Sequence, residues 1–138
     1  MDEVDGSTLG GLDMDALDGI ARSMGIEIVE ATARRVVARM PVKGNTQPYG
    51  VLHGGASCVL AETIGSIGSA LHAGPGHITM GIEISASHHR SVSEGYVTAV
   101  ATQVHGGRTL TSYEIIITDD RDRRICTSRL TCVVRDRP

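Results

Sequence analysis

Hydrophobic residues in the middle of the chain recur with the spacing of an amphipathic helix. From position 54 to about 71, Leu60, Ile64, Ile67 and Leu71 stand at i, i+4, i+7 and i+11, which matches a helical period of about 3.6 residues. The segment HAGPGH follows directly, and its glycines and proline are typical of a helix end. The pattern therefore predicts one long helix over about 54–71.

Most of the remaining chain alternates between apolar and polar positions, as strands do. Residues 26–42 (IEIVEATARRVVARMPV) predict either one bent strand or a hairpin with its corner at ATAR, ended by Pro41 and Gly44. Beyond Gly76, alternating segments are separated by turn residues, which predicts hairpin connections and an antiparallel meander. The segments are 77–92, 95–105, 109–119 and 123–134, and the turns are Ser93-Glu94-Gly95, Gly106-Gly107 and DDRD.

A shorter helical pattern precedes the strands. Residues 12–24 (LDMDALDGIARSM) repeat apolar side chains with a helical rhythm and carry acids in the early turns, which predicts a short amphipathic helix. We expect residues 1–138 to form a single α+β domain with an N-terminal segment over 1–24, because 138 residues suffice for one core and not for a second module. In this domain the antiparallel sheet covers the central helix.

Composition narrows the expected partners and cellular setting. The chain is 41% hydrophobic with a net charge of -3, and it has no Trp, no Phe and only 3 Tyr, so nucleic acid is not an expected partner. The acidic start lacks a signal-peptide pattern, and the uncharged stretches contain His, Pro and Gly, so we expect a cytoplasmic protein outside the membrane. The 3 cysteines lack zinc-site spacing and predict reduced thiols and no metal site.

Charged side chains are nearly missing around the central helix. The 39 residues between Lys43 and Glu83 hold only Glu62, where the chain average of 21% charged predicts about eight. Glu62 lies opposite the apolar face, on a face of small residues that indicates close contact with a ligand or a second subunit. The alternative is a buried acid held by hydrogen bonds or by an arginine of the sheet. The other members of this small face are Cys58, Gly65, Ser66 and Ser69.

The segment GVLHGGA leads directly into the central helix. It places the backbone amides of Gly54 and Gly55 at the helix N-terminus, where free donors and partial positive charge can stabilise an oxyanion. Two glycines also let a ligand approach the backbone. The alternative is a plain glycine-rich turn, with His53 as a capping or core residue.

The Glu62 carboxylate and the Gly54 amide lie far apart along the predicted helix. Glu62 follows Gly54 by eight residues, which is roughly 12 Å along the axis and about 80° around it. One carbonyl group does not easily contact both within the ~3 Å that catalysis requires. If both groups serve one site, they come from different copies of the chain. The active unit is then at least a dimer, with two central helices related by a twofold axis along their small faces.

These residues lie in sequence blocks that resemble a known protein family. The blocks NTQPYGVLHGGASCVLAETIGSIGSAL, GIEISASHHRSVSEGYV and DRDRRICTSRLTC resemble the hotdog-fold acyl-CoA thioesterases of the PaaI-like branch, over about 24–134. Within that branch, the sequence is most similar to the bacterial 1,4-dihydroxy-2-naphthoyl-CoA and hydroxybenzoyl-CoA thioesterases. The resemblance implies an antiparallel sheet wrapped around the central helix. It also implies a homo-oligomer, a dimer of dimers with its sites at subunit interfaces.

The resemblance further implies roles for individual residues. Glu62 is implied as the nucleophile or general base, and Ser66, one turn later, as the residue that positions the attacking water. The Gly54 amide is implied as the donor to the thioester oxygen, with Gln47 and His53 helping to position or polarise that group. Substrate contacts are expected at Gly55 and His88, at Ile67 for acyl selectivity, and at Arg90, Gly107, Arg108 and Thr109 for nucleotide and phosphates.

The predicted activity is hydrolysis of an acyl-CoA substrate to a free acid and coenzyme A. A positioned carboxylate and a helix terminus suffice for this reaction, so neither a metal nor an organic cofactor is expected. A Ser-His-Asp hydrolase would need G-x-S-x-G, which Ser57 and Ser66 do not complete. Adjacent His88 and His89 point to opposite faces of a strand, so they do not share a metal ion with Glu83. Two alternatives remain: a hydroxyacyl-CoA dehydratase or hydratase on the same fold, and a non-catalytic acyl-CoA-binding regulatory domain.

Overall fold

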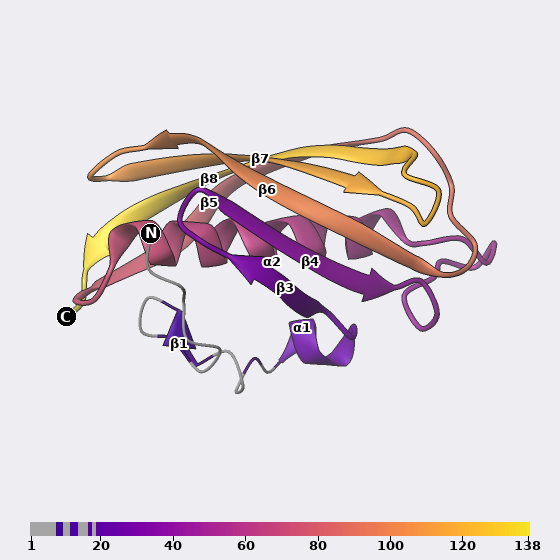
Figure 1. The fold of residues 1–138 in the computed structure, drawn as a ribbon, viewed down its shortest axis with the longest axis horizontal. Helices are drawn as coiled ribbons and strands as arrows, with labels where there is room; N and C mark the ends of the chain where they lie inside the picture. Colours follow the sequence, from indigo (N-terminus) through magenta and orange to yellow (C-terminus); the bar gives the residue numbers. More distant parts are fainter. Residues whose placement is uncertain (1–7, 10–11, 14–16, 18) are drawn as a thin grey trace.

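The computed structural model describes residues 8–9, 12–13, 17 and 19–138. In this part of the chain a long helix, α2, is wrapped by an antiparallel sheet (Figure 1). The elements in chain order are β1 (Thr8–Leu9), β2 (Leu12–Asp13), α1 (Ile20–Ser23), β3 (Glu27–Ala31), β4 (Arg35–Pro41), α2 (Gly54–Ala73), β5 (His77–His88), β6 (Tyr96–Gly106), β7 (Leu110–Thr118) and β8 (Arg124–Asp136).

The central helix α2 confirms the prediction made from hydrophobic spacing. It spans Gly54–Ala73 and is followed by Gly74, whose φ of 75° lies in the left-handed region that glycine tolerates. Leu60 and Ile64 have no exposed surface and form the centre of the core together with apolar side chains of the sheet. Within the described ranges, no helix is both long and apolar enough to cross a membrane.

The sheet is antiparallel throughout, as predicted, but its strand order is not a meander. The order is β3-β4-β6-β7-β8-β5, so β5 pairs with β8, and β6 pairs with β4. The prediction of a hairpin at Ser93-Glu94-Gly95 is therefore wrong, because this connection crosses from one side of the sheet to the other. The crossing places β5 on the far side of α2, so that strands lie along both sides of the helix (Figure 1).

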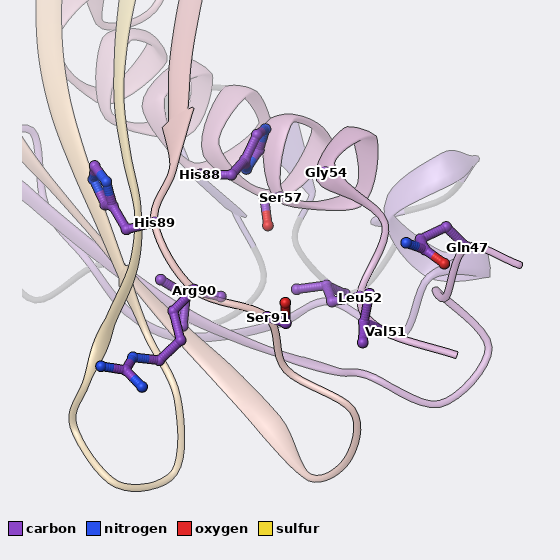
Figure 2. Close-up of a pocket in the computed structure, with 10 residues that line it drawn as sticks. Gln47, Val51, Leu52, Gly54, Ser57, His88, His89, Arg90 and Ser91 are labelled. Carbon is purple, nitrogen blue, oxygen red and sulfur yellow. The ribbon is translucent and has the colours of Figure 1, made fainter. Parts of the chain in front are cut away.

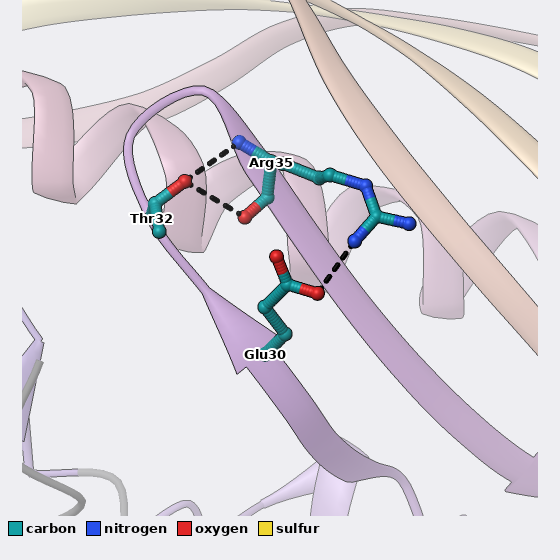
Figure 3. A network of polar contacts seen from close by, with 3 residues as sticks. All are labelled: Glu30, Thr32 and Arg35. Atoms are coloured by element: carbon teal, nitrogen blue, oxygen red, sulfur yellow. Dashed lines mark hydrogen bonds and ion pairs between the residues drawn. The ribbon is translucent and has the colours of Figure 1, made fainter. Parts of the chain in front are cut away.

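The segment over 26–42 forms a hairpin and not a bent strand. Its turn is held by Thr32, whose Oγ1 accepts a hydrogen bond from the amide of Arg35 at 3.0 Å and donates to its carbonyl at 3.2 Å (Figure 3). The guanidinium of Arg35 also pairs with Glu30 across the two strands. These contacts satisfy the polar groups at the corner that the ATAR segment predicted.

The helix predicted over 12–24 is wrong for most of its length. Leu12–Asp13 forms strand β2, paired with β1, and the helix α1 covers only Ile20–Ser23. Residues 14–16 and 18 lie outside the described part of the chain. The physical reason for the late start is Gly19, whose φ of 68° is incompatible with a continuous right-handed helix through that position.

The small face of α2 packs mostly against the sheet of its own chain. A Cβ added at Gly65 would lie 2.6 Å from Cδ2 of Leu130 on β8, so the helix approaches this strand closely. Ser69 is fully buried, and its hydroxyl shares a 2.7 Å hydrogen bond with that of Thr111 on β7. The expectation that this face contacts a ligand or a second subunit is therefore wrong at Gly65 and Ser69. Glu62 is the exposed member of this face.

Replacing Gly68 by alanine is expected to destabilise the fold despite alanine's higher helix propensity. The new Cβ would lie 2.7 Å from the ring of Tyr113, which is fully buried and whose hydroxyl donates to the carbonyl of Ala33. Overpacking of this kind typically costs about 1–3 kcal/mol, whereas the propensity gain is about 1 kcal/mol. Thermal unfolding should show a Tm lower by a few degrees. Gly65→Ala is the matched control with a smaller expected loss, because its Cβ meets the end of the flexible Leu130 side chain; an equal loss would contradict the argument.

Candidate active site

A cavity of about 320 Å³ lies beside the start of α2 (Figure 2). It is enclosed by the loop that precedes the helix, by the first turns of the helix and by the chain at the end of β5. Its volume falls at the lower end of the ~300–1,000 Å³ typical of small-molecule sites. The lining residues are Gln47, Val51, Leu52, Gly54, Ser57, His88, His89, Arg90, Ser91 and Ile125.

The N-terminus of α2 presents one backbone amide to this cavity. His53 caps the helix, with its Nδ1 accepting from the amide of Gly55 at 2.8 Å and its carbonyl accepting from that of Ala56 at 2.9 Å. The amide of Gly54 donates to no other residue of the described chain. The prediction of two free amides therefore applies to Gly54 and not to Gly55, because the histidine cap uses the second one.

His88 lies directly against Gly54. A Cβ added at Gly54 would be 2.9 Å from Nε2 of the imidazole, so only glycine leaves room for the ring at this distance. His88 is the last residue of β5 and is held in register opposite Cys126 of β8. Figure 2 shows its ring beside the first turns of α2. A ligand atom bound by the Gly54 amide is therefore within reach of the imidazole.

Gln47 enters the cavity from the loop before the helix. The loop is closed by hydrogen bonds of 2.9 Å from the Gln47 amide to the Val51 carbonyl and from the Gly50 amide to the Gln47 carbonyl. The side-chain Oε1 of Gln47 accepts a hydrogen bond from the amide of Tyr49. That contact directs Nε2, a hydrogen-bond donor, toward the cavity, as Figure 2 shows.

Glu62 lies at the open edge of the sheet and does not line the cavity. A Cβ added at Gly81 would be 2.7 Å from Oε2 of Glu62, so the carboxylate lies against the backbone of β5. In the sheet, β5 pairs with β8 alone, which makes it an edge strand. None of the ion pairs formed by described side chains includes Glu62. The hypothesis of a buried acid paired with an arginine is therefore wrong for the described chain.

Two other candidates on α2 also lie away from the cavity. Ser66, one turn after Glu62, is partly buried and lies near the thiol of Cys132, outside the lining of the cavity. Burial raises the pKa of Cys132, and hydroxyl donors that include Ser66 offset part of that rise. Ile67 is 3% exposed and belongs to the hydrophobic core. Its expected contact with the acyl group is not available within one chain.

The cysteine thiols are not poised for nucleophilic chemistry. Burial raises the pKa of Cys126 to about 11, and the neighbouring Cys58 adds to that rise. Burial also raises the pKa of Cys58, with a further contribution from the charge of Glu62. A raised pKa keeps each thiol protonated at neutral pH, and the thiolate is the reactive form. The described residues also contain no group of His, Cys, Asp and Glu side chains suited to hold a metal ion.

The predicted phosphate-contacting turn lies at the opposite end of α2. Gly107 connects β6 to β7, and its carbonyl lies 2.8 Å from Nε2 of His72 in the last turn of the helix. Beside this turn is a second cavity of about 370 Å³. It is lined by His77, Arg108, Thr109, Val134, Arg135 and Asp136. The 20 residues of α2 span roughly 30 Å, so the two cavities of one chain are too far apart for one small group.

The structure thus brings part of the predicted site together and adds residues that were not predicted. Gln47, Gly54, His88 and Arg90 line one cavity, whereas the other predicted residues lie elsewhere. Ser57 also faces the cavity, and its position three residues after Gly54, on the same side of the helix, was a signal for this. Most remaining additions come from loops whose conformation has no short sequence signature, namely Val51, Leu52, His89 and Ser91, and Ile125 comes from the start of β8.

An antiparallel six-stranded sheet wrapped around one long helix is the hotdog fold, and the chain belongs to the hotdog thioesterases. The family model of the Thioesterase superfamily matches residues 49–126, which include α2 and the cavity residues from Val51 to Ile125. The protein is a thioester hydrolase.

Relatives of known name are similar over nearly their whole length. The proofreading thioesterase EntH of Cronobacter turicensis is 44% identical over 128 residues, which cover 92% of this chain and 93% of EntH. The crystal structure of thioesterase HI1161 from Haemophilus influenzae has a TM-score of 0.86 at 39% identity and covers 94% of this chain and 91% of its own.

A third relative is known from two variant structures. The thioesterase SAV0944 of Staphylococcus aureus is 33% identical, with a TM-score of 0.78 and coverage of 84% of this chain and 98% of its own in one of them. One variant replaces a glutamine by alanine, and the other replaces a glutamate 15 positions later. Gln47 and Glu62 of the present chain are also 15 positions apart.

Proposed function

We propose that the protein is a cytoplasmic acyl-CoA thioesterase that hydrolyses an acyl- or aryl-CoA to the free acid and coenzyme A. Aryl substrates of the 1,4-dihydroxy-2-naphthoyl, hydroxybenzoyl or phenylacetyl type are the classes that the sequence resemblance suggests. The observation that carries the proposal is the amide of Gly54, which faces a cavity in a chain of the thioesterase family and donates to no other described residue. A thioester carbonyl oxygen fits such a donor.

The proposed first task of the site is to polarise the thioester carbonyl. The Gly54 amide and Nε2 of Gln47 are donors on the cavity wall, and both suit an oxygen that gains negative charge in the transition state. His88 lies beside them and lines the path of the acyl or pantetheine group. His53 acts indirectly, because its cap fixes the first turn that presents the Gly54 amide.

The proposed second task is delivery of the attacking group by Glu62. Acting as a general base, the carboxylate takes a proton from water while the water oxygen bonds to the carbonyl carbon. Collapse of the tetrahedral intermediate breaks the carbon–sulfur bond, and the coenzyme A thiolate leaves and takes up a proton. Acting as a nucleophile, Glu62 would bond to the carbon itself and expel the coenzyme A thiolate, and water would then hydrolyse the resulting anhydride to the free acid and the Glu62 carboxylate. Ser66 positions the water in either route.

A second copy of the chain brings Glu62 to the cavity in this proposal. Glu62 lies at the free edge of β5, where Met80 and Ile82 are exposed by 55% and 59%. An edge strand with exposed apolar side chains is suited to pair with another strand, and a twofold axis at this edge makes each site from two chains. This arrangement replaces the contact between small helix faces that we expected from the sequence. A dimer of dimers is the proposed assembly.

Phosphate contacts are proposed at the far turn. The cavity beside Gly107 contains the cations Arg108 and Arg135 and the hydroxyl of Thr109, groups that bind phosphate oxygens well. Nδ1 of His77 at this cavity is buried without a hydrogen-bond partner among the described residues. Since this turn is far from Gly54 in one chain, a coenzyme A that contacts both would span two copies. Arg90, at the first cavity, is the alternative contact for the nucleotide.

Release of free thiol from a panel of acyl-CoA and aryl-CoA substrates tests the proposal. A thioesterase produces one thiol per substrate consumed, and mass spectrometry identifies the free acid. A dehydratase or hydratase of the same fold would change the acyl chain without releasing coenzyme A. A binding domain would retain substrate and change nothing. Either of the last two results, for every substrate tested, would overturn the proposal.

A further inference from the structure

The hydroxyl of Ser57 faces the cavity and has no hydrogen-bond partner in the described chain. The residue is 2% exposed and lies one turn into α2. Its side chain makes no hydrogen bond to another described residue, although its Oγ lines the cavity wall. Its Oγ is not among the buried polar atoms that lack a partner in the described chain, so it stays open to the cavity and can bond to a ligand there. Ser69, which lies about three turns later on the same helix and is fully buried, bonds instead to Thr111 of the same chain.

A second hydroxyl faces Ser57 across the cavity. Ser91 lies in the connection after β5, and Figure 2 shows the hydroxyls of Ser57 and Ser91 pointing toward one another from opposite walls. Val51, Leu52 and Ile125 add apolar surface to the same cavity, and Gln47, His88, His89 and Arg90 add polar groups. A facing pair of hydroxyls in a cavity that also has apolar surface suits an apolar group with one polar substituent, since each hydroxyl can donate or accept.

The position of Ser57 relative to Gly54 indicates which part of a substrate it contacts. Three helical residues separate them, which is roughly 4.5 Å along the axis and about 60° around it. If the thioester carbonyl is bound by the Gly54 amide, Ser57 lies beside atoms a few bonds from the carbonyl carbon. We assign these atoms to the acyl group, because the side chains of Val51, Leu52 and Ile125 offer it apolar contacts in this cavity.

We propose that the hydroxyls of Ser57 and Ser91 bind a polar substituent of the acyl group and thereby determine acyl selectivity. The inference rests on the proposed acyl-CoA thioesterase function. It assigns to this hydroxyl pair the selectivity that the sequence suggested for Ile67, which is buried in the core. Acyl groups that carry a hydroxyl near the carbonyl are preferred over their unsubstituted analogues, because only the former offer a hydrogen-bond partner to the Ser57 hydroxyl.

Paired substrates that differ by one hydroxyl test this inference. The kcat/KM of benzoyl-CoA is compared with that of its ortho, meta and para hydroxy isomers, and butyryl-CoA is compared with its hydroxylated analogue at the β carbon. In the wild type, at least one hydroxylated member should be preferred. Ser57→Ala should reduce that preference by roughly tenfold, mainly by slowing the hydroxylated substrate, as expected for loss of one hydrogen bond in a buried site.

Two further variants keep the test decisive. Ser91→Ala alters an exposed residue, so the chain should fold even if Ser57→Ala does not, and it should reduce the same preference. Ser87→Ala is the matched control, because this exposed serine of β5 lies outside the cavity, and it should leave the preference unchanged. The inference is overturned if Ser57→Ala and Ser91→Ala both leave the ratio of kcat/KM between hydroxylated and unsubstituted substrates unchanged. It is also overturned if kcat/KM falls equally for both members of every pair. In either case the proposed thioesterase activity is retained. A wild type that releases no thiol from any substrate would instead overturn the proposed function.

Discussion

Replacing Glu62 by glutamine is expected to lower kcat/KM for thioester hydrolysis by at least about 100-fold, because a positioned general base contributes roughly 10²–10⁴ in rate. The change removes the charge and keeps the size of the side chain. Glu62 is exposed in the single chain and makes no ion pair with a described residue, so folding should be unaffected. Initial rates of thiol release measure the loss, and circular dichroism with thermal unfolding verifies the fold.

A matched acid on the neighbouring strand provides the control. Glu83 is an exposed carboxylate of β5 that does not line the cavity. Glu83→Gln changes the net charge by the same amount, so it reports any general effect of charge on substrate attraction. Its activity should stay close to that of the wild type. Comparable activity of Glu62→Gln and the wild type would exclude Glu62 as base and as nucleophile.

Replacing Gly54 by alanine is expected to lower kcat by about 100-fold, since a displacement near 1 Å at a reacting centre can cost that much. The added Cβ would be 2.9 Å from Nε2 of His88, so either the imidazole or the helix start has to move. The amide is retained in this variant, and the loss therefore reports its placement against the carbonyl. A KM close to that of the wild type would show that the transition state is affected more than substrate binding.

Mixing these two inactive variants tests whether one site uses two chains. Glu62→Gln and Gly54→Ala chains are refolded together, with each variant refolded alone as the control. If Glu62 of one copy serves the Gly54 amide of the other, random dimers recover about a quarter of the wild-type rate, because half of them are mixed and each mixed dimer has one intact site. No recovery, together with full activity of an isolated wild-type monomer, would contradict the shared site.

Sequence patterns predicted the central helix and the strands because both depend on local periodicity. The strand order could not be predicted in the same way. Ser93-Glu94-Gly95 has the composition of a hairpin turn, yet its strands pair with β8 and β4, because wrapping the sheet around α2 is a property of the whole chain. The small residues on one face of α2 indicated that another group packs closely against the helix. They did not reveal that the approaching side chains are Leu130 and Thr111 of the same chain.

Of the candidate site, the sequence predicted the backbone hydrogen-bond donor at the start of α2 best. The segment HGG at a helix start implies a free amide, and the structure presents that of Gly54. It could not show that His53 would occupy the amide of Gly55, since a cap and a catalytic histidine have the same sequence. Ser57 was considered only as part of an incomplete nucleophile motif. Its burial and the facing Ser91 depend on loops that fold around the helix.

The strand order also has a consequence during synthesis on the ribosome. His88 at the end of β5 pairs with Cys126 at the start of β8, so β5 has no partner in its own sheet until residues 89–123 and the start of β8 have been made. Until then, Met80 and Ile82 belong to a strand with both edges free. Non-local pairing of this kind slows folding and exposes nascent chains to aggregation. Chaperone dependence of the yield should therefore be greatest for chains that stall or are truncated before β8.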